Sequence, residues 1–277
     1  MIDVLIALLF GIVEGITEWL PVSSTGHMIL LNEFVTMNVS LAFWEMFLVV
    51  IQLGAIIAVV ILFWKKIFPF HVSKRAREQY GALKMKTLRL WGLALIACVP
   101  AAIVGVLFDD VLDEVFYHWY VVAAALIVFG IAFIVIENWN AGKKPRVRKL
   151  SQLTVRDALI IGVFQLIAAV FPGTSRSGAT IVGALLIGVA RTVAAEFTFI
   201  LAIPVMFGAS LLKLLKFGFS FTGAEALILL AGTASAFFVS LLVIRMLMRF
   251  IRTHDFKLFG YYRILLGLIV IVYFVLR

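Results

Sequence analysis

Charged residues are scarce in this chain, at 14% of its 277 residues, whereas 64% are hydrophobic. A soluble domain of this length needs far more polar surface to cover its core. The single cysteine, Cys98, lies in an apolar run, which excludes a disulfide framework. No Gly-Lys-Ser or Gly-Lys-Thr follows a suitable glycine, so the phosphate-binding loop of soluble nucleotide hydrolases is also absent.

Long runs without any charge are present instead. Each is about long enough to cross a ~30 Å hydrocarbon core at ~1.5 Å per helical residue. One such run could be a signal peptide, but four cannot, and the first apolar stretch has no basic segment before it. We therefore predict an all-α, polytopic membrane protein. The uncharged runs are 46–64, 90–108, 119–136 and 226–244.

Two apolar stretches are interrupted near their middle by a proline. Residues 158–190 would span roughly 50 Å as one straight helix, which is too long for a bilayer. The pair Pro172-Gly173 breaks this helix, because proline removes a backbone N–H and glycine loosens the chain. Residues 4–31 have the same pattern around Pro21. We predict two re-entrant helical hairpins buried in the bundle, because irregular backbone at membrane depth needs protein or a watery cavity to satisfy it.

The sequences around the two prolines resemble each other. GIVEGITEWLPVSS (11–24) and GVFQLIAAVFPGTS (162–175) align without a gap, and small polar residues follow the proline in both. This coincidence predicts an internal repeat. The aligned pairs include Gly11 with Gly162, Glu14 with Gln165, Pro21 with Pro172, Ser23 with Thr174 and Ser24 with Ser175.

Three candidate spans follow each hairpin. Because three is odd, the second copy would cross the membrane upside down relative to the first, as in the inverted repeats of many transporters. We predict one membrane domain, 1–277, with six full transmembrane helices and two re-entrant hairpins, built from inverted repeats at 1–138 and 150–277. The spans are expected near 43–64, 90–108, 119–137, 196–215, 225–248 and 258–276.

Lysine and arginine gather in loops that belong to one side of the membrane. The loops 65–89 and 138–157 are basic, whereas the loop at 109–114 is acidic. By the positive-inside rule, the basic loops are cytoplasmic and both chain ends lie outside. The net charge of +9 then reflects membrane orientation and not binding of nucleic acid. Arg263 is assigned to the inner side with the other cations. The basic residues of the first loop are Lys65, Lys66, Lys74, Arg75, Arg77, Lys84, Lys86 and Arg89.

Four ionisable residues lie inside the two hairpins: Glu14, Glu18, His27 and Arg176. Ionisable side chains at membrane depth are costly to bury and commonly mark functional sites. Glu14 and Glu18 are four residues apart, so they share one helix face. Two carboxylates on one face can hold a divalent metal ion, Mg²⁺ or Ca²⁺. The alternative is that one of them only pairs with Arg176.

Each proline precedes a turn rich in Ser and Thr and then a new half-helix. Ser and Thr cap helix N-termini, and a helix N-terminus is an anion site. Capping alone does not explain Arg176, because a guanidinium in an apolar run needs an anionic partner and its planar fork suits phosphate. We expect the two turns to cradle one phosphate. The substrate-binding candidates are Ser23, Thr25, Gly26, Thr174, Ser175, Ser177 and Gly178.

His27 lies three residues after Ser24, in the polar turn of the first hairpin. A lone histidine is often a satisfied core residue, but this one shares its turn with hydroxyls, and imidazole suits proton transfer at neutral pH. We predict a catalytic role for His27.

Three motifs surround the prolines: EGITE at 14–18, PVSSTGH at 21–27 and PGTSRSG at 172–178. Together with VIQLG at 50–54 and FTF at 197–199, they resemble the signatures of the undecaprenyl-diphosphate phosphatase family, also called the bacitracin-resistance family. The resemblance covers nearly the whole chain. It implies an enzyme of the bacterial inner membrane, with an outward-facing site, that converts a polyprenyl diphosphate lipid to the monophosphate and inorganic phosphate.

The resemblance also implies roles for single residues. Glu14 and Glu18 would form the acidic motif, Ser24 would be the nucleophile, His27 the acid/base and Arg176 the phosphate clamp. The catalytic residues that the resemblance implies are thus Ser24, His27, Glu18 and Arg176. Either Ser24 or a water molecule would attack phosphorus, because phosphoryl transfer relies mostly on positioning and electrostatics and the residues do not choose between them. The expected partners are the lipid substrate and membrane lipids, without nucleic acid. A homo-oligomer is compatible with the sequence, which does not set the oligomeric state or the prenyl chain length.

Two other functions are compatible with parts of this pattern. Inverted repeats with paired hairpins also occur in transporters, so a flippase of polyprenyl phosphate is the alternative to a phosphatase. A structural protein without a ligand is disfavoured, because a buried arginine would destabilise an inert bundle. A second lipid-phosphatase family has Ser-Arg followed by a distant histidine, but no histidine follows Arg176 before His254.

Overall fold

The described part of the protein consists of α-helices and turns, without a β-strand. Within it, six helical segments are long and apolar enough to cross a membrane. The predicted all-α class is therefore confirmed, and the protein is a multi-pass membrane protein. Lys74 and Arg75, two of the predicted loop cations, lie outside the described residues. The computed structural model describes residues 1–73, 77 and 79–277, with the backbone alone at 106, 109–111 and 113.

The candidate spans follow the predicted order and approximate positions. The first span is built from two helices that meet at Ile51, and the other spans are single helices. The bounds are α3 (Leu41–Val50) and α4 (Gln52–Ile67) for the first span, then α6 (Met85–Phe116), α7 (Trp119–Asn140), α10 (Arg191–Phe217), α11 (Gly223–Phe250) and α12 (Lys257–Leu276).

The two stretches around the prolines form helix–turn–helix pairs. Pro21 and Pro172 lie in the turns, where a missing backbone N–H costs no helical hydrogen bond. The predicted breaks are therefore confirmed, while re-entry into the membrane stays a prediction. The first pair is α1 (Ile2–Thr17) with α2 (Ser24–Phe34), and the second is α8 (Val155–Val170) with α9 (Arg176–Leu186). A short 3-10 turn, Leu150–Gln152, precedes α8.

The sequence predicted a loop at the acidic segment 109–114, and this prediction is wrong. The segment forms the last turns of α6, which continues to Phe116 and also passes through Pro100. Apolarity marks where a chain leaves the hydrocarbon, but a helix satisfies its own backbone groups and can continue into water. The hydropathy of the sequence therefore predicted where the apolar span ends, but it did not predict where the helix ends.

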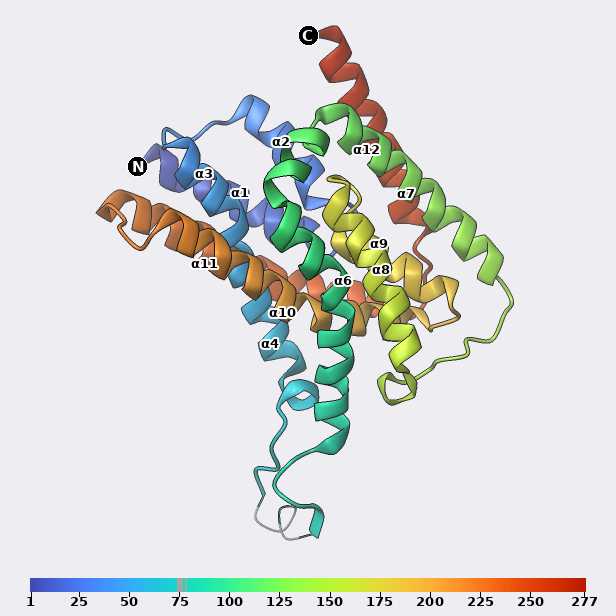
Figure 1. Cartoon of the computed structure of the whole chain (residues 1–277). Coiled ribbons are helices and arrows are strands. Elements are labelled where there is room, and N and C mark those ends of the chain that lie inside the picture. The colour runs from blue at the N-terminus through green and yellow to red at the C-terminus, as the bar shows by residue number, and fades with distance from the viewer. Residues whose placement is uncertain (74–76, 78) are drawn as a thin grey trace.

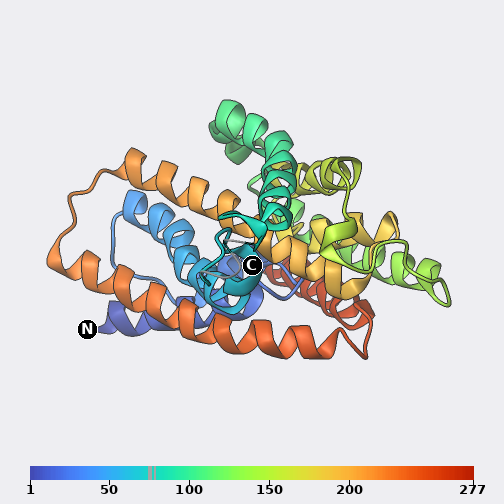
Figure 2. The same cartoon turned by 90° about the horizontal axis from the view of Figure 1, so that it is seen from below.

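The hairpins are held by the spans of the opposite half of the chain. α1 packs along α11 and α8 packs along α6, while α7 and α12 run side by side (Figures 1 and 2). Gly11 lies against the backbone of Gly232, and Gly162 lies against that of Ala97, so neither position has room for a side chain. These reciprocal contacts are what two related halves would give, and the inverted repeat stays a prediction.

Candidate functional site

The two proline turns meet at the side chain of Arg263. Its guanidinium, on α12, donates to the carbonyl oxygen of Pro21 at 3.2 Å and to those of Gly173 and Thr174 at 3.0 and 2.8 Å. The Arg263 side chain is fully buried. One cation therefore joins the turn of the first hairpin to that of the second, and the predicted meeting of the two turns is confirmed.

The sequence assigned Arg263 to the inner side or its boundary together with the other cations, but its side chain lies buried among the helices and binds both turns. The side of the membrane on which Arg263 lies stays a prediction. A turn at membrane depth leaves carbonyl groups without helical partners, and each buried carbonyl needs a donor. A guanidinium carries five N–H donors and can satisfy several carbonyls at once. The sequence shows a cation near the start of a span, but it does not show that two distant turns present oxygens to it.

Replacing Arg263 with Met is expected to lower the thermal stability of the detergent-purified protein. Methionine fills much of the volume but leaves the turn carbonyls unpaired, at a cost of about 1–3 kcal/mol for each buried group. Arg245, which is exposed on α11, provides the matched control. Thermal unfolding followed by intrinsic fluorescence would show a lower Tm for R263M and an unchanged Tm for R245M. Equal Tm values for both would mean that Arg263 does not hold the turns.

The second helix of each pair begins with the same local structure. Ser23 caps α2 and Ser175 caps α9, both with a left-handed backbone, at φ 75° and 68°. Each hydroxyl accepts a hydrogen bond from a glycine N–H, that of Gly26 at 3.3 Å and that of Gly178 at 3.2 Å. Non-glycine residues rarely adopt this backbone, and its presence at both turns marks them as equivalent sites.

This equivalence differs from the gapless alignment, which paired Ser24 with Ser175. The second turn has one more residue between its proline and its cap, so Ser23 corresponds to Ser175. Ser24 and Arg176 are then equivalent, each being the first residue of its helix. The predicted nucleophile and the predicted phosphate clamp occupy the same position in the two halves.

Glu18 connects Ser24 with Arg176. Its Oε1 accepts a hydrogen bond from Arg176 Nη2 at 3.0 Å, and its Oε2 accepts one from Ser24 Oγ at 3.0 Å. The carboxylate is buried, with 8% of the residue exposed. Of the alternatives for the two glutamates, pairing with Arg176 is therefore realised for Glu18. A hydroxyl, a carboxylate and a guanidinium from both hairpins form one connected group.

Further contacts fix this group from the second half of the chain. Arg176 Nη1 donates to the carbonyl of Thr198 at 3.0 Å, and Ser177 Oγ donates to that of Glu18 at 3.1 Å. The hydroxyls of Thr180 and Thr198 lie 2.9 Å apart. Thr198 belongs to the FTF motif, so that motif supports Arg176. Thr25 is half-buried and takes part in none of these contacts.

Glu14 lies one turn before Glu18 and is almost fully buried, with 1% exposed. Its Oε1 has no hydrogen-bond partner among the residues that the structure describes, and Gln52 lies beside its side chain. A buried carboxylate oxygen without a donor fits a cation better than it fits an apolar core. No group of three His, Cys, Asp or Glu lies together among the described residues, so a metal ion at the two glutamates stays a prediction.

Other buried polar atoms at the two turns also have no hydrogen-bond partner within the described part of the chain. They include Thr174 Oγ1, Arg176 Nε and Arg263 Nε, besides Glu14 Oε1. Native proteins leave few buried polar atoms unpaired, and those that remain commonly face ions, water or a reacting group. Donors and acceptors gathered in one buried place are suited to a polar ligand such as phosphate.

His27 does not contact Ser24 through a hydrogen bond. Its Nδ1 lies 2.7 Å from the carbonyl oxygen of Ser23 and its Nε2 lies 2.7 Å from the Tyr262 hydroxyl. A carbonyl only accepts, so in the neutral ring Nδ1 carries the proton and Nε2 accepts from Tyr262. The two rings are stacked, with centroids 5.7 Å apart. Sequence reasoning missed Tyr262, because nothing in the motif distinguishes it from the neighbouring Tyr261.

Replacing Tyr262 with Phe is expected to lower kcat about 2- to 10-fold, which corresponds to the loss of one hydrogen bond. Phenylalanine keeps the stacked ring but frees His27 Nε2, so His27 loses its fixed orientation. The matched control is Tyr261→Phe, because both tyrosines are exposed on α12 and the hydrogen bond to His27 comes from Tyr262. Steady-state phosphate release is the measurement, with KM determined in parallel. A wild-type kcat in Y262F would show that the bond to His27 does not matter for turnover.

Comparison with known proteins identifies the family of this chain. The family model described as bacitracin resistance protein BacA matches residues 7–269, which include both turns and every site residue above. The chain belongs to this family. The undecaprenyl-diphosphatase of Desulfitobacterium hafniense is 60% identical over 277 residues, covering 100% of this chain and 98% of that protein. Undecaprenyl-diphosphatase 1 of Clostridium acetobutylicum is 60% identical over 99% of this chain and 98% of its own length. An undecaprenyl-diphosphatase of Enterococcus faecalis is 56% identical over 98% and 97%.

Proposed function

We propose that this protein is a membrane phosphatase that hydrolyses undecaprenyl diphosphate to the monophosphate and inorganic phosphate, and so recycles the lipid carrier for cell-wall synthesis. Full-length relatives with the name undecaprenyl-diphosphatase support this proposal. The structural observation that carries it is the placement of Glu18 between the Ser24 hydroxyl and the Arg176 guanidinium. A hydroxyl with an adjacent base and a planar cation is an arrangement suited to phosphoryl transfer.

In this proposal the terminal phosphate of the substrate binds between the two turns. Arg176 holds two of its oxygens through the guanidinium fork, and the N-termini of α2 and α9 direct unpaired N–H groups and positive dipole ends toward it. The Arg263 side chain keeps the two turns together during binding. Positioning of the phosphate is the main contribution of these groups.

The chemical step then starts from the Ser24–Glu18 contact. Ser24 Oγ attacks the terminal phosphorus and forms an O–P bond while the bridging P–O bond breaks, and the leaving polyprenyl monophosphate takes the electron pair. Glu18 accepts the proton of Ser24. Water then hydrolyses the phosphoserine, with His27 as the acid/base. Direct attack by a water molecule held by Glu18 would use the same carboxylate, so Glu18 is required in either route.

A divalent metal ion, Mg²⁺ or Ca²⁺, is part of the proposal. Glu14 and Glu18 would hold it, since carboxylate oxygens suit both ions and Mg²⁺ is usually bound by one or two carboxylates together with substrate phosphates. When bound, such an ion would neutralise negative charge on the diphosphate.

We place the protein in the bacterial inner membrane, with both chain ends and the site toward the outside. The two ends lie in the upper part of Figure 1, whereas the described residues of 68–73 and 79–84 project from the lower side. The basic residues of the loops 65–89 and 138–157 support a cytoplasmic position for that lower side.

Phosphate release by the purified protein tests this function. The protein in detergent with Mg²⁺ is expected to release one phosphate per polyprenyl diphosphate and to leave the monophosphate lipid, which thin-layer chromatography identifies. A flippase would instead move labelled polyprenyl phosphate across reconstituted vesicles and release no phosphate from the diphosphate. That second result would overturn the proposal.

A further inference from the structure

A basic pocket lies where α4 ends and α6 begins, near the lower side of Figure 1. Its walls come from the last turn of α4, the first turns of α6 and the 3-10 turn Leu150–Gln152. The pocket measures about 210 Å³, which is smaller than the usual small-molecule site and suits one end of a larger molecule, such as a headgroup. None of the candidate-site residues is among the described residues that line it.

Four cations line this pocket: Lys65 and Lys66 from α4, and Lys86 and Arg89 from α6. No carboxylate is found among the described residues of the lining. Glu196, which lies outside the lining, pairs with Lys66 at 2.7 Å and offsets one of the four charges. Lys65 and Lys86 form no ion pair or hydrogen bond within the described part of the chain. A hollow lined by charges of one sign attracts the opposite charge, so this pocket favours an anion.

Hydrogen bonds between its walls preform the pocket. The Thr87 hydroxyl of α6 donates to the carbonyl oxygen of Lys66, on α4, at 3.3 Å. The Arg89 guanidinium donates to the carbonyl oxygen of Leu153, which follows the 3-10 turn, at 3.0 Å. A guanidinium has five N–H donors, so Arg89 keeps donors for a ligand. A preformed site loses little conformational freedom when a ligand binds.

The part of the lining toward the membrane interior is apolar. Leu90 and Leu93 of α6 belong to it and are buried. Because α4 and α6 belong to two candidate membrane spans, the pocket lies at the end of the apolar region, next to the basic loop. A phospholipid has the same two-part chemistry, with a charged phosphate next to apolar chains. A free phosphate ion would use the cations alone.

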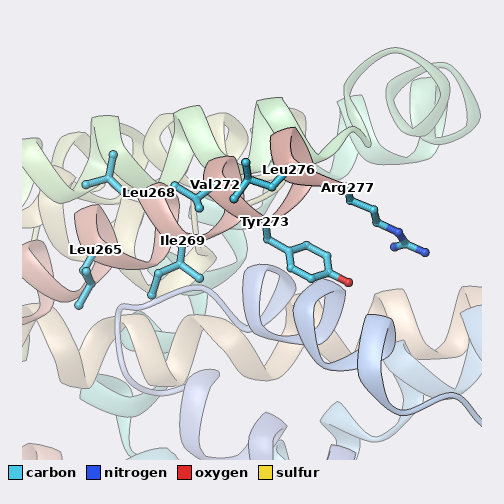
Figure 3. A pocket seen from close by; sticks show the side chains of 7 residues that line it. All are labelled: Leu265, Leu268, Ile269, Val272, Tyr273, Leu276 and Arg277. Carbon is cyan, nitrogen blue, oxygen red and sulfur yellow. The ribbon is translucent and has the colours of Figure 1, made fainter.

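The larger hollow along the C-terminal half of α12 lacks this combination. Its described lining comes from that one helix, and its cation, Arg277, already pairs with Glu33 (Figure 3). The basic pocket instead joins three segments of the chain and carries positive charge that Glu196 offsets only in part.

We propose that this pocket binds the headgroup phosphate of an anionic phospholipid, with the beginning of an acyl chain against Leu90 and Leu93. With the orientation proposed above, the lipid belongs to the cytoplasmic leaflet, where basic pockets between membrane helices suit such headgroups. The lipid bridges α4, α6 and the 3-10 turn. A ligand that binds only the folded protein stabilises it, so anionic lipid is expected to raise the Tm of the detergent-purified protein.

Lipid binding to the purified protein tests this proposal without depending on phosphate release. The probes are phosphatidylglycerol, which is anionic, and phosphatidylcholine, which carries the same phosphate without net charge. Native mass spectrometry measures the affinity of each. We expect wild type to prefer phosphatidylglycerol, and the double substitution Lys65→Gln, Lys86→Gln to weaken its binding about 10- to 30-fold, the combined effect of two cations near a lipid phosphate. Both side chains are exposed, so the variant is expected to fold, which gel filtration checks.

The matched control is the double substitution Lys143→Gln, Lys144→Gln, which removes the same charge from exposed positions in the other basic loop. It is expected to keep the affinity for phosphatidylglycerol within about 2-fold of wild type. Equal weakening in both double variants would assign the binding to overall positive charge and overturn a defined site. Equal affinity of wild type for the two lipids would also overturn it.

Glycerol phosphate distinguishes a lipid from a free phosphate in this pocket. It carries an anionic phosphate without acyl chains, so we expect it to leave phosphatidylglycerol bound when both are present at equal concentration. Displacement of the lipid by glycerol phosphate would show a simple anion site without a role for Leu90 and Leu93, and would contradict the proposal.

Discussion

Replacing Arg176 with Ala is expected to lower kcat/KM for phosphate release about 10²- to 10³-fold, the usual effect of removing one preorganised charge-stabilising donor group from an active site. Arg176 is largely buried, donates to Glu18 and to the carbonyl of Thr198, and stands at the N-terminus of α9. Alanine removes the planar fork and leaves the Glu18 carboxylate without its cation. Steady-state release of phosphate from polyprenyl diphosphate is the measurement.

Two further variants distinguish the planar guanidinium of Arg176 from the effect of its positive charge and from the loss of any arginine. Arg176→Lys keeps the charge but cannot donate as a planar fork, so we expect an activity between those of R176A and wild type. Arg156→Ala removes an exposed arginine from the same hairpin, on α8, and is expected to keep kcat/KM within about 2-fold, as is usual for surface changes. Gel filtration in detergent confirms that each variant is folded. Full activity in R176A would show that Arg176 has no role in phosphate release.

Replacing Glu18 with Gln is expected to lower kcat about 10²- to 10⁴-fold, the range for loss of a general base. Glutamine has nearly the same shape and can still accept a hydrogen bond from Arg176. Its amide cannot take the proton of Ser24 Oγ, which now lies 3.0 Å from the carboxylate. The control is Glu45→Gln, because Glu45 is an exposed carboxylate on α3.

The same experiment decides between two bases. The sequence favoured His27 as the partner of Ser24, but in the structure His27 bonds Ser23 and Tyr262 instead. If Glu18 is the base for Ser24, E18Q loses formation of the phosphoserine, whereas H27Q loses only its hydrolysis. Retention of activity in E18Q together with a large loss in H27Q would return the role to His27.

The residues that sequence reasoning placed correctly are those whose signal is local. Pro21 and Pro172 each interrupt an apolar run, and a proline inside a helix has a known cost. Arg176 in an apolar run demands an anionic partner whatever the fold, and Glu18 provides it. These features depend on their own segments, so one sequence sufficed to predict two breaks and one buried cation.

The residues that it missed act over long distances in the chain. Arg263 binds carbonyls at Pro21 and Gly173. The packing of α12 along α7 brings this side chain to both turns. Tyr262 and Tyr261 have the same side chain, and the rotation of α12 decides which of them faces His27. The extra residue in the second turn escaped a gapless alignment, because equivalent backbone geometry appears only in three dimensions.

The central claim is that the two turns form one active site, with Ser24 from the first and Arg176 from the second. A double-mutant cycle tests it directly, using ³²P-labelled polyprenyl diphosphate to follow the slow variants S24A and R176A and the double variant. Residues that act as a unit lose activity non-additively, so the double variant is expected to lose no more than about 3-fold beyond the worse single variant. If the two losses multiply, the turns act independently and the account is contradicted.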